Sequence, residues 1–199
     1  NILTPPYIKF SFKNEINIKS TINKIDKNFK FPVVLKPINE GSSVGVYITN
    51  KKNFNRNLMK LEKFKEVLIE KYIPGREIQA AILGNKNLGI IELKPKRKFY
   101  DYKAKYSASA KTEHIIPVNI SLKNLNKINS IAMKAHKLLK CRGVSRSDFR
   151  FYKNEFYLLE LNTQPGMTSL SLVPEIAKYK NISFTKLLEE IINDASINK

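Results

Sequence analysis

Cysteine and long apolar runs are scarce in this 199-residue chain. The single cysteine, Cys141, cannot form an internal disulfide, which fits a reducing compartment, and we interpret it as a structural thiol. No apolar run is long enough to cross a bilayer, and no stretch has the charged start and apolar middle of a secretory leader. We therefore expect a cytoplasmic location and no membrane partner.

Acidic residues are also few: 17 Asp and Glu stand against 36 Lys and Arg, which gives a net charge of +19. Such an excess can indicate a nucleic-acid partner. The lysines, however, are spread over the whole chain among Asn and Ile residues, a usage typical of an AT-rich genome. No cluster of arginines with interleaved aromatic residues stands out. We therefore predict no specific nucleic-acid partner.

The composition supports a folded core, with 42% hydrophobic and 10% aromatic residues. The chain begins at Asn1 rather than Met, and its first ten residues, "NILTPPYIKF", are typical of a linker or of the start of a strand. We therefore expect a piece of a longer protein, or a truncated one.

Hydrophobic periodicity predicts a mixture of strands and helices. Strands are predicted at 31–36, 44–49, 67–72, 77–83, 88–93, 144–152 and 156–161, and helices at 52–65, 122–140 and 183–195. The polar, tyrosine-rich segment 97–117 is typical of a lid or of a disordered loop. His136 falls outside the apolar stripe of its helix, which predicts a solvated side chain, and His114 is given no role.

A hairpin is predicted from the strands at 144–152 and 156–161, and four polar side chains on it or directly after it form a candidate site. Residues two apart share a face of a strand, so Arg146 and Asp148 lie on one face, as do Glu160 and Asn162. A three-residue loop, 153–155, would place Asp148 opposite Glu160 and Arg146 opposite Asn162. A two-residue loop would place Leu159 opposite Asp148 instead.

Carboxylate and amide oxygens without His or Cys are typical ligands of a hard cation such as Mg²⁺. Asp148, Glu160 and Asn162 are therefore candidate ligands. The spacing alone favours a solvent-facing hairpin whose acids pair with nearby lysines.

The segment "KPINEGSSVG" places Lys36 at the end of a strand, followed by Gly41, Ser42, Ser43 and Gly45. Small residues let backbone N–H groups approach phosphate oxygens, and a lysine supplies a positive charge. The segment is neither a Walker nor a dinucleotide motif, and alone it could be an ordinary turn. Together with a magnesium-type patch it indicates a bound nucleoside triphosphate.

Five segments occur in one order along the chain: "KPINEGSSVGV", "VLIEKYIPGREI", "FYDYKAKY", "GVSRSDF" and "LLELNTQPGMTSLSLVP". Together they resemble the central and C-terminal parts of the D-alanine–D-alanine ligases, which are ATP-grasp enzymes. The resemblance implies an α+β fold with two lobes, each with a mostly antiparallel sheet, that hold ATP between them. It implies a central lobe at 1–75 and a C-terminal lobe at 76–199, with a lid at about 97–117.

The resemblance also implies the roles of individual residues. The ATP-binding residues would be Lys36, Glu70, Lys71, Tyr72, Ile73, Glu77 and Lys105. The metal ligands, for Mg²⁺ or Mn²⁺ and for two ions, would be Asp148, Glu160 and Asn162. The carboxylate of the second D-alanine would lie at Ser171 and Leu172, and the groups that act on the intermediate or fasten the lid would be Arg146, Gly166, Ser42 and Tyr106.

The implied activity is ATP-dependent joining of two D-alanines through an acyl phosphate, for peptidoglycan synthesis in the cytoplasm. The family has an N-terminal domain that is not in this sequence and that completes the first D-alanine pocket, so we expect little activity from these 199 residues alone. The sequence departs mildly from the family pattern at Tyr72, Ser145 and Ser147, the last standing where an apolar residue is common. Relatives also suggest a homodimer. The alternatives are another ATP-grasp carboxylate–amine ligase and a nucleotide-binding remnant without ligase activity.

Overall fold

The computed structural model of the chain describes all residues except 14–16, 96–111, 169 and 196–199. These residues divide into two compact units. The small unit comprises the described residues of Pro5–Ile73 and Pro95–Thr112, and the large unit comprises those of Asn1–Thr4, Pro74–Lys94 and Glu113–Lys199. Both units combine helices with an antiparallel sheet, which confirms the predicted α+β class.

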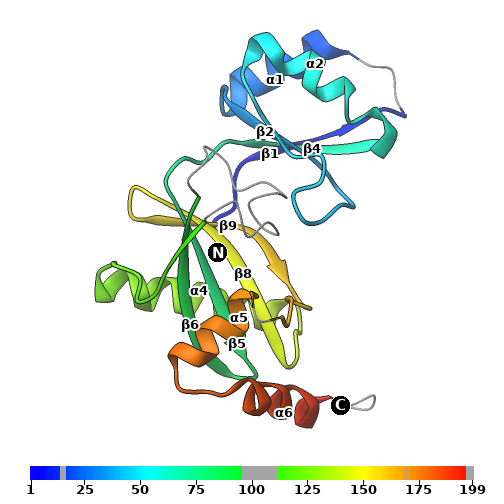
Figure 1. Cartoon of the computed structure of the whole chain (residues 1–199). Helices are drawn as coiled ribbons and strands as arrows, with labels where there is room; N and C mark the ends of the chain where they lie inside the picture. Colours follow the sequence, from blue (N-terminus) through cyan, green and yellow to red (C-terminus); the bar gives the residue numbers. More distant parts are fainter. Residues whose placement is uncertain (14–16, 96–111, 169, 196–199) are drawn as a thin grey trace. The chain divides into compact units, whose positions relative to one another are not determined.

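The small unit has a four-stranded sheet in the order β1-β4-β2-β3, with helices over one face (Figure 1). Its strands are β1 (Tyr7–Ser11), β2 (Val33–Pro37), β3 (Tyr47–Thr49) and β4 (Glu66–Lys71), and its α-helices are α1 (Ile18–Asn28) and α2 (Phe54–Met59). The predicted helix at 52–65 is broken: α2 is flanked by the 3₁₀ helices η1 (Lys51–Asn53) and η2 (Glu62–Phe64). The sequence analysis gave residues 1–10 as a linker or the start of a strand, and β1 begins there, but it missed α1.

Alternation along β2 decides which side chains of the small unit are available for a ligand. Val33 and Leu35 are fully buried in the core with Ile25 of α1 and Phe54 of α2. Lys36, between two inward-facing positions, therefore lies on the sheet face away from these helices.

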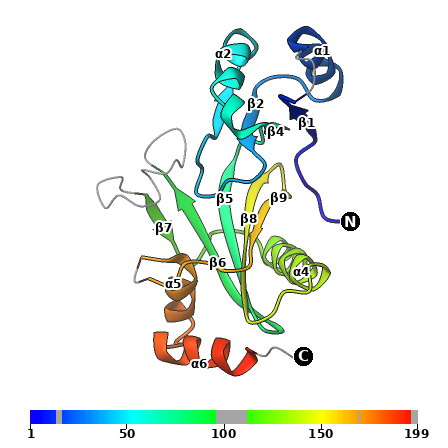
Figure 2. The same ribbon diagram turned by 90° about the vertical axis from the view of Figure 1, so that its right-hand side faces the viewer.

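The large unit has a five-stranded sheet in the order β7-β6-β5-β8-β9 (Figure 2). Its strands are β5 (Arg76–Leu83), β6 (Lys86–Lys94), β7 (Glu113–Ile115), β8 (Val144–Tyr152) and β9 (Glu155–Asn162). Its helices are α4 (Leu122–Leu138), α5 (Leu172–Tyr179) and α6 (Phe184–Asp194). No helix among the described residues has the length and apolar character needed to cross a membrane.

Helices pack on both faces of the large sheet. Ile78, Ile82 and Phe149 form a core with Ile128 and Ala132 of α4 on one face. Helix α5 covers the other face over β6, where a Cβ at Gly89 would lie 2.8 Å from the Ile176 side chain. Residues 77, 79 and 81 of β5 therefore face away from α4.

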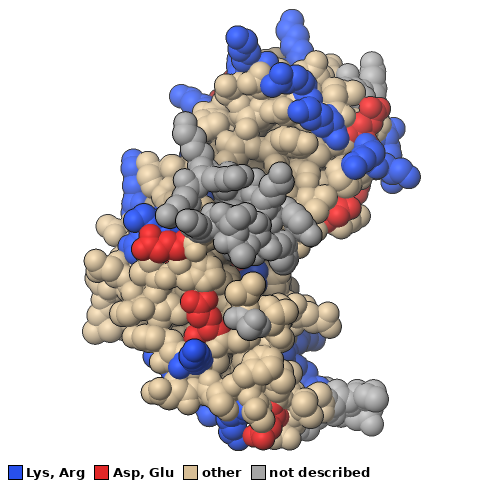
Figure 3. Space-filling model, in the orientation of Figure 1, with Lys and Arg blue, Asp and Glu red and all other residues tan. Residues whose placement is uncertain are grey.

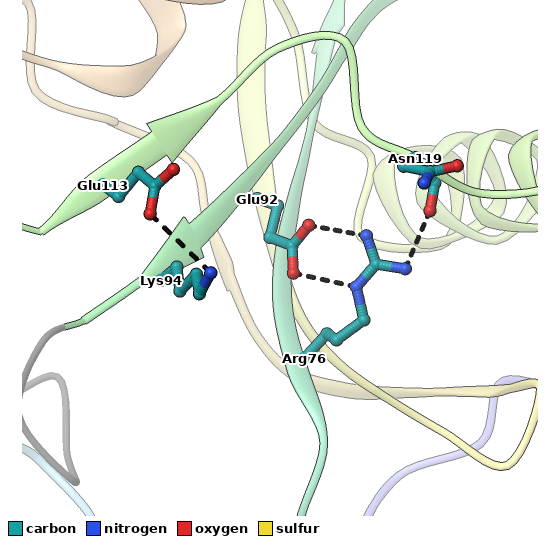
Figure 4. Close-up of polar contacts among 5 residues, drawn as sticks. All are labelled: Arg76, Glu92, Lys94, Glu113 and Asn119. Carbon is teal, nitrogen blue, oxygen red and sulfur yellow. Dashed lines mark hydrogen bonds and ion pairs between the residues drawn. The ribbon is translucent and has the colours of Figure 1, made fainter.

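An ion pair fixes the beginning of β5 to its neighbour. The Arg76 guanidinium donates two hydrogen bonds to the Glu92 carboxylate on β6, at 2.8 and 2.5 Å (Figure 4). A third bond, of 2.9 Å, reaches the carbonyl of Asn119, in the segment before α4. Next to it, Lys94 of β6 lies 3.8 Å from Glu113 of β7. The strand that carries Glu77 is thus held at its first residue.

His136 is buried rather than solvated, so this sequence prediction was wrong. Only 3% of its surface is exposed, and its Nδ1 lies 2.7 Å from the Ser145 hydroxyl on β8. Because α4 lies flat on the sheet, its buried side is wider than the stripe of apolar residues. A hydrogen bond to the strand makes this burial possible.

Burial lowers the pKa of His136 below its usual 6.5. The unfolded chain therefore binds a proton near pH 6.5 while the folded chain stays neutral. We expect this contribution to the unfolding free energy to be complete above pH 6.5 and to be lost as the pH falls below it. Histidine NMR resonances, from only two residues, and urea unfolding between pH 5 and 8 would measure it. The decline should be smaller in a His136→Gln variant, and titration of His136 at or above pH 6.5 would contradict the prediction.

Ser147 is fully buried on β8, and its hydroxyl has no hydrogen-bond partner among the described residues. An unmade hydrogen bond of this kind costs about 1–3 kcal/mol. We therefore expect Ser147→Ala to raise the unfolding free energy by about 1 kcal/mol in urea titrations. Ser145→Ala, two residues earlier, is the matched control and should lower it, because His136 would lose its partner. Equal losses in both variants would refute this interpretation.

Candidate functional site

The predicted polar patch is present on the β8–β9 hairpin of the large unit. Arg146 pairs with Asn162 and Asp148 pairs with Glu160, as the three-residue loop predicted. The loop itself has only two residues, however, because Tyr152 pairs with Glu155. Lys153 and Asn154 both have positive φ, of 50° and 62°, as a type I′ turn requires.

A β-bulge restores the predicted pairing. The register shifts between Asp148 and Phe149, which leaves Leu159 without a cross-strand partner. The extra residue moves Glu160 into the position opposite Asp148, and bulges of this kind are common beside functional sites.

Asp148 is buried and bound by Arg146. The residue is 6% exposed, and its carboxylate accepts hydrogen bonds from Nε of Arg146 at 2.7 Å and from Nη2 at 3.0 Å. Burial raises the pKa of Asp148 to about 6; Arg146 works against this shift, and the charge of Glu160 adds to it. The patch therefore favours additional positive charge beside Asp148.

The ligand types fit a hard cation. Asp148 and Glu160 supply carboxylates and Asn162 an amide, whose nitrogen lies 3.4 Å from Oε1 of Glu160. Carboxylate oxygens have more than one acceptor site each, so the Arg146 bonds leave Asp148 able to bind a cation. Asp148 pairs with an arginine and not with a surface lysine. Within the described part of the chain, no three His, Cys, Asp or Glu residues form a metal-binding group, so a cation here would depend on two acids and the amide.

The loop after β9 brings Gly166 against the beginning of α5. A Cβ at Gly166 would lie 2.9 Å from Oγ of Ser171. Ser171 is the N-cap residue of α5, and its hydroxyl accepts a 2.9 Å bond from the backbone N–H of Thr168. Leu172, the first residue of the helix, is 8% exposed. The positive end of the helix dipole thus lies beside Gly166, as a carboxylate-binding site needs.

The remaining large-unit residue, Glu77, lies 3.2 Å from Arg150, its cross-strand partner on β8. It faces the same side of the sheet as Asp148, since both lie on the face away from α4. Lys105 and Tyr106 lie outside the described residues, as does most of the predicted lid.

The small unit brings Lys36 and Glu70 together. Nζ of Lys36 lies 2.9 Å from the Glu70 carboxylate, across β2 and β4. The glycine-rich loop follows Lys36, and Ser42, Ser43 and Gly45 in it have positive φ. A side chain at Gly45 would contact Pro37 at 2.9 Å and Leu61 at 3.0 Å, so the loop packs closely against its own unit.

The segment after Glu70 is held by its backbone. The N–H groups of Lys71 and Tyr72 donate to the carbonyls of Pro6 and Pro32, at 2.9 and 3.2 Å. Ile73 is 5% exposed. Any contact of Lys71 or Tyr72 with a nucleotide base would therefore use the carbonyl groups or the side chains rather than these two donors.

Two further arrangements were missed from sequence. His114 of β7 lies 2.6 Å from Glu175 in the first turn of α5. Gln79 of β5 lies opposite Asp148. Because residues two apart on a strand share a face, the place of Gln79 on the same face as Glu77 could have been predicted. No local signal links His114 with Glu175, 61 residues away.

Comparison with known proteins gives consistent matches. Residues 1–193 match the family model described as D-ala D-ala ligase C-terminus. The D-alanine–D-alanine ligase of Pelagibacter ubique is 64% identical over 199 residues, and that of Carboxydothermus hydrogenoformans is 43% identical over 198 residues. These alignments cover 100% and 96% of this chain but only 64% and 63% of those proteins. The chain thus spans less than two thirds of the length of these relatives.

Solved structures show the same fold. A crystal structure of the D-alanine–D-alanine ligase from Bacillus anthracis matches 97% of this chain with a TM-score of 0.83 and 36% identity, over 62% of its own length. A structure of a D-alanine–D-alanine ligase from Bacillus anthracis complexed with ATP matches with a TM-score of 0.79 and 30% identity, over 97% of this chain and 60% of that one. The VanG D-Ala:D-Ser ligase from Enterococcus faecalis matches 96% of this chain and 57% of its own, with a TM-score of 0.81 and 29% identity. The predicted ATP-grasp fold is confirmed.

Proposed function

Since the chain belongs to the D-ala D-ala ligase C-terminus family, we propose that it takes part in the ATP-dependent joining of two D-alanines to D-alanyl-D-alanine, with ADP as a product. The observation that carries this proposal is the Arg146–Asp148–Glu160–Asn162 patch. It combines acids for a cation with a guanidinium for an oxyanion. The dipeptide would supply peptidoglycan synthesis in the cytoplasm.

The residues that we assign to nucleotide binding come from both units. We assign the phosphates of ATP to Lys36 and Lys105, the ribose to Glu77, and the adenine to Glu70, Lys71, Tyr72 and Ile73. The Lys36–Glu70 ion pair supports this grouping, because Glu70 holds the lysine amine on the sheet face away from the helices.

A divalent cation, Mg²⁺ or Mn²⁺ and in our proposal two ions, would be held by Asp148, Glu160 and Asn162 and would neutralise charge on the transferred phosphoryl group. Two groups of the chain itself act when the amine of the second D-alanine attacks. Arg146 presents a fixed guanidinium to the oxygen that becomes negative when the amine attacks the acyl phosphate. The N–H of Gly166 faces the same atom in our assignment.

The acceptor D-alanine binds through its carboxylate at Ser171 and Leu172, where the helix dipole of α5 favours a negative group. Ser42 and Tyr106 would fasten the lid, which protects the acyl phosphate from water. An N-terminal domain would complete the pocket for the first D-alanine, and we propose a homodimer for the complete protein.

A phosphate-release assay tests this function. The 199-residue chain, joined to the preceding third of the Pelagibacter ubique ligase, should release phosphate only when ATP, Mg²⁺ and D-alanine are all present. Mass spectrometry should find D-alanyl-D-alanine. The 199 residues alone should show little turnover. The absence of D-alanine-dependent turnover in the joined protein would reject the assignment.

A second candidate has a different acceptor. The VanG neighbour joins D-Ala to D-Ser by its name, so another carboxylate–amine ligation by this site is the alternative. The same assay with D-serine in place of the second D-alanine separates the two. A nucleotide-binding remnant would bind ATP and release no phosphate with any of them.

A further inference from the structure

Gln79 is the second side chain with a buried oxygen that has no hydrogen-bond partner among the described residues. The residue is 1% exposed and lies in the middle of β5, the central strand of the large sheet. A buried amide oxygen without a hydrogen-bond partner destabilises a fold. Its presence therefore indicates a bound ligand or another functional role. The other group of this kind, Ser147, faces the opposite side of the sheet.

The register places Gln79 in one row with the two candidate acids. Gln79 of β5 pairs with Asp148 of β8, and Asp148 pairs with Glu160 of β9. Directly paired residues present their side chains on the same face of a sheet. The neighbours Ile78 and Ala80 pack into the core beneath α4, which confirms that Gln79 faces the other way.

We propose that Gln79 belongs to the divalent-cation site, where its amide oxygen receives the cation or one of the cation's water molecules. The proposal rests on the cation site of the proposed function. An amide oxygen is a hard, neutral ligand of the kind that Mg²⁺ and Mn²⁺ accept, and it adds no charge next to Asp148 and Glu160. A ligand at this position would give the buried oxygen its partner, whereas a purely structural role gives no reason for a glutamine here.

The test compares Mn²⁺ binding and stability in the 199-residue chain. Gln79→Met has nearly the same shape but no polar oxygen. Its Mn²⁺ dissociation constant, measured by EPR without nucleotide, should be about tenfold higher than that of the wild type, as for other residues that support metal ligands. Its melting temperature without metal should be equal or higher, because the unpartnered amide is gone. A residue with a purely structural role would show the reverse: a lower melting temperature and unchanged Mn²⁺ affinity.

Two further variants complete the experiment. Ser147→Ala removes the other unpartnered oxygen on the opposite face and should leave the Mn²⁺ dissociation constant unchanged. Gln79→Glu keeps an oxygen and should bind Mn²⁺ at least as tightly as the wild type. This variant tests the proposal even if Gln79→Met does not fold. Equal Mn²⁺ affinity of wild type and Gln79→Met, or weaker binding by Gln79→Glu, overturns the inference alone. No Mn²⁺ binding by the wild type overturns the cation site itself, and with it both proposals.

Discussion

Arg146→Met is expected to lower the unfolding free energy by about 3–5 kcal/mol at pH 8, because it leaves a buried carboxylate without its charged partner. Asp148 is 6% exposed, and both of its oxygens accept bonds from Arg146. Removal of any other charged side chain of the patch would leave behind a charged group that is less buried than Asp148. Urea unfolding in EDTA, which excludes divalent cations, measures the loss.

The loss should depend on pH in a defined direction. The pKa of folded Asp148 is raised to about 6 from an ordinary value of 3.8. Ionisation therefore disfavours the folded state, and this destabilising contribution appears as the pH rises from about 4 through 6. Arg146 opposes it, so the difference between wild type and variant should be small at pH 4.5 and full at pH 8.

A double variant provides the control. Arg146→Met combined with Asp148→Asn removes both charges, and replacing a buried pair in this way is often close to neutral. The double variant should therefore regain most of the stability lost in Arg146→Met alone. An equal loss at pH 4.5 and 8, or no recovery in the double variant, would show that the pair does not act through charge.

The bounds of the two strands that carry the site could be predicted from sequence. Segment 144–152 was predicted with the bounds of β8, and 156–161 differs from β9 by one residue at each end. The pairing of Asp148 with Glu160 was also predicted correctly, but through a wrong loop. The sequence does not show that a two-residue turn and a bulge at Leu159 give the same pairing as a three-residue loop.

Other features depend on tertiary packing that no local pattern carries. His136 is polar, but α4 lies on the sheet and buries it against Ser145. Helix α1, by contrast, was missed although Ile18, Ile22 and Ile25 follow helical spacing and pack in or against the core of the small unit. The assignment of ligand-binding roles came from resemblance to a family, since spacing alone favoured an ion-paired hairpin.

Gly75→Ala is expected to lower the unfolding free energy by about 3 kcal/mol or more, through backbone strain and a steric clash. Gly75 lies in the "IPGRE" turn that leads into β5, with φ of 105°, a conformation that side chains rarely adopt. A Cβ there would lie 2.3 Å from the carbonyl oxygen of Phe151, which belongs to the backbone of β8 and cannot rotate away. The change would push apart the ends of β5 and β8, the strands that carry Glu77 and Asp148.

Gly84→Ala is the matched control for this prediction. Gly84 also has positive φ, of 55°, but a Cβ there would meet nothing within 4 Å. It should therefore cost only the conformational penalty of about 1–2 kcal/mol. Urea unfolding of both variants separates strain from clash, because only Gly75→Ala adds the collision with Phe151. Similar losses in the two variants would mean that the turn moves to accept a side chain. The ends of β5 and β8 would then be held less firmly than the bond of Arg150 to the Gly75 carbonyl implies.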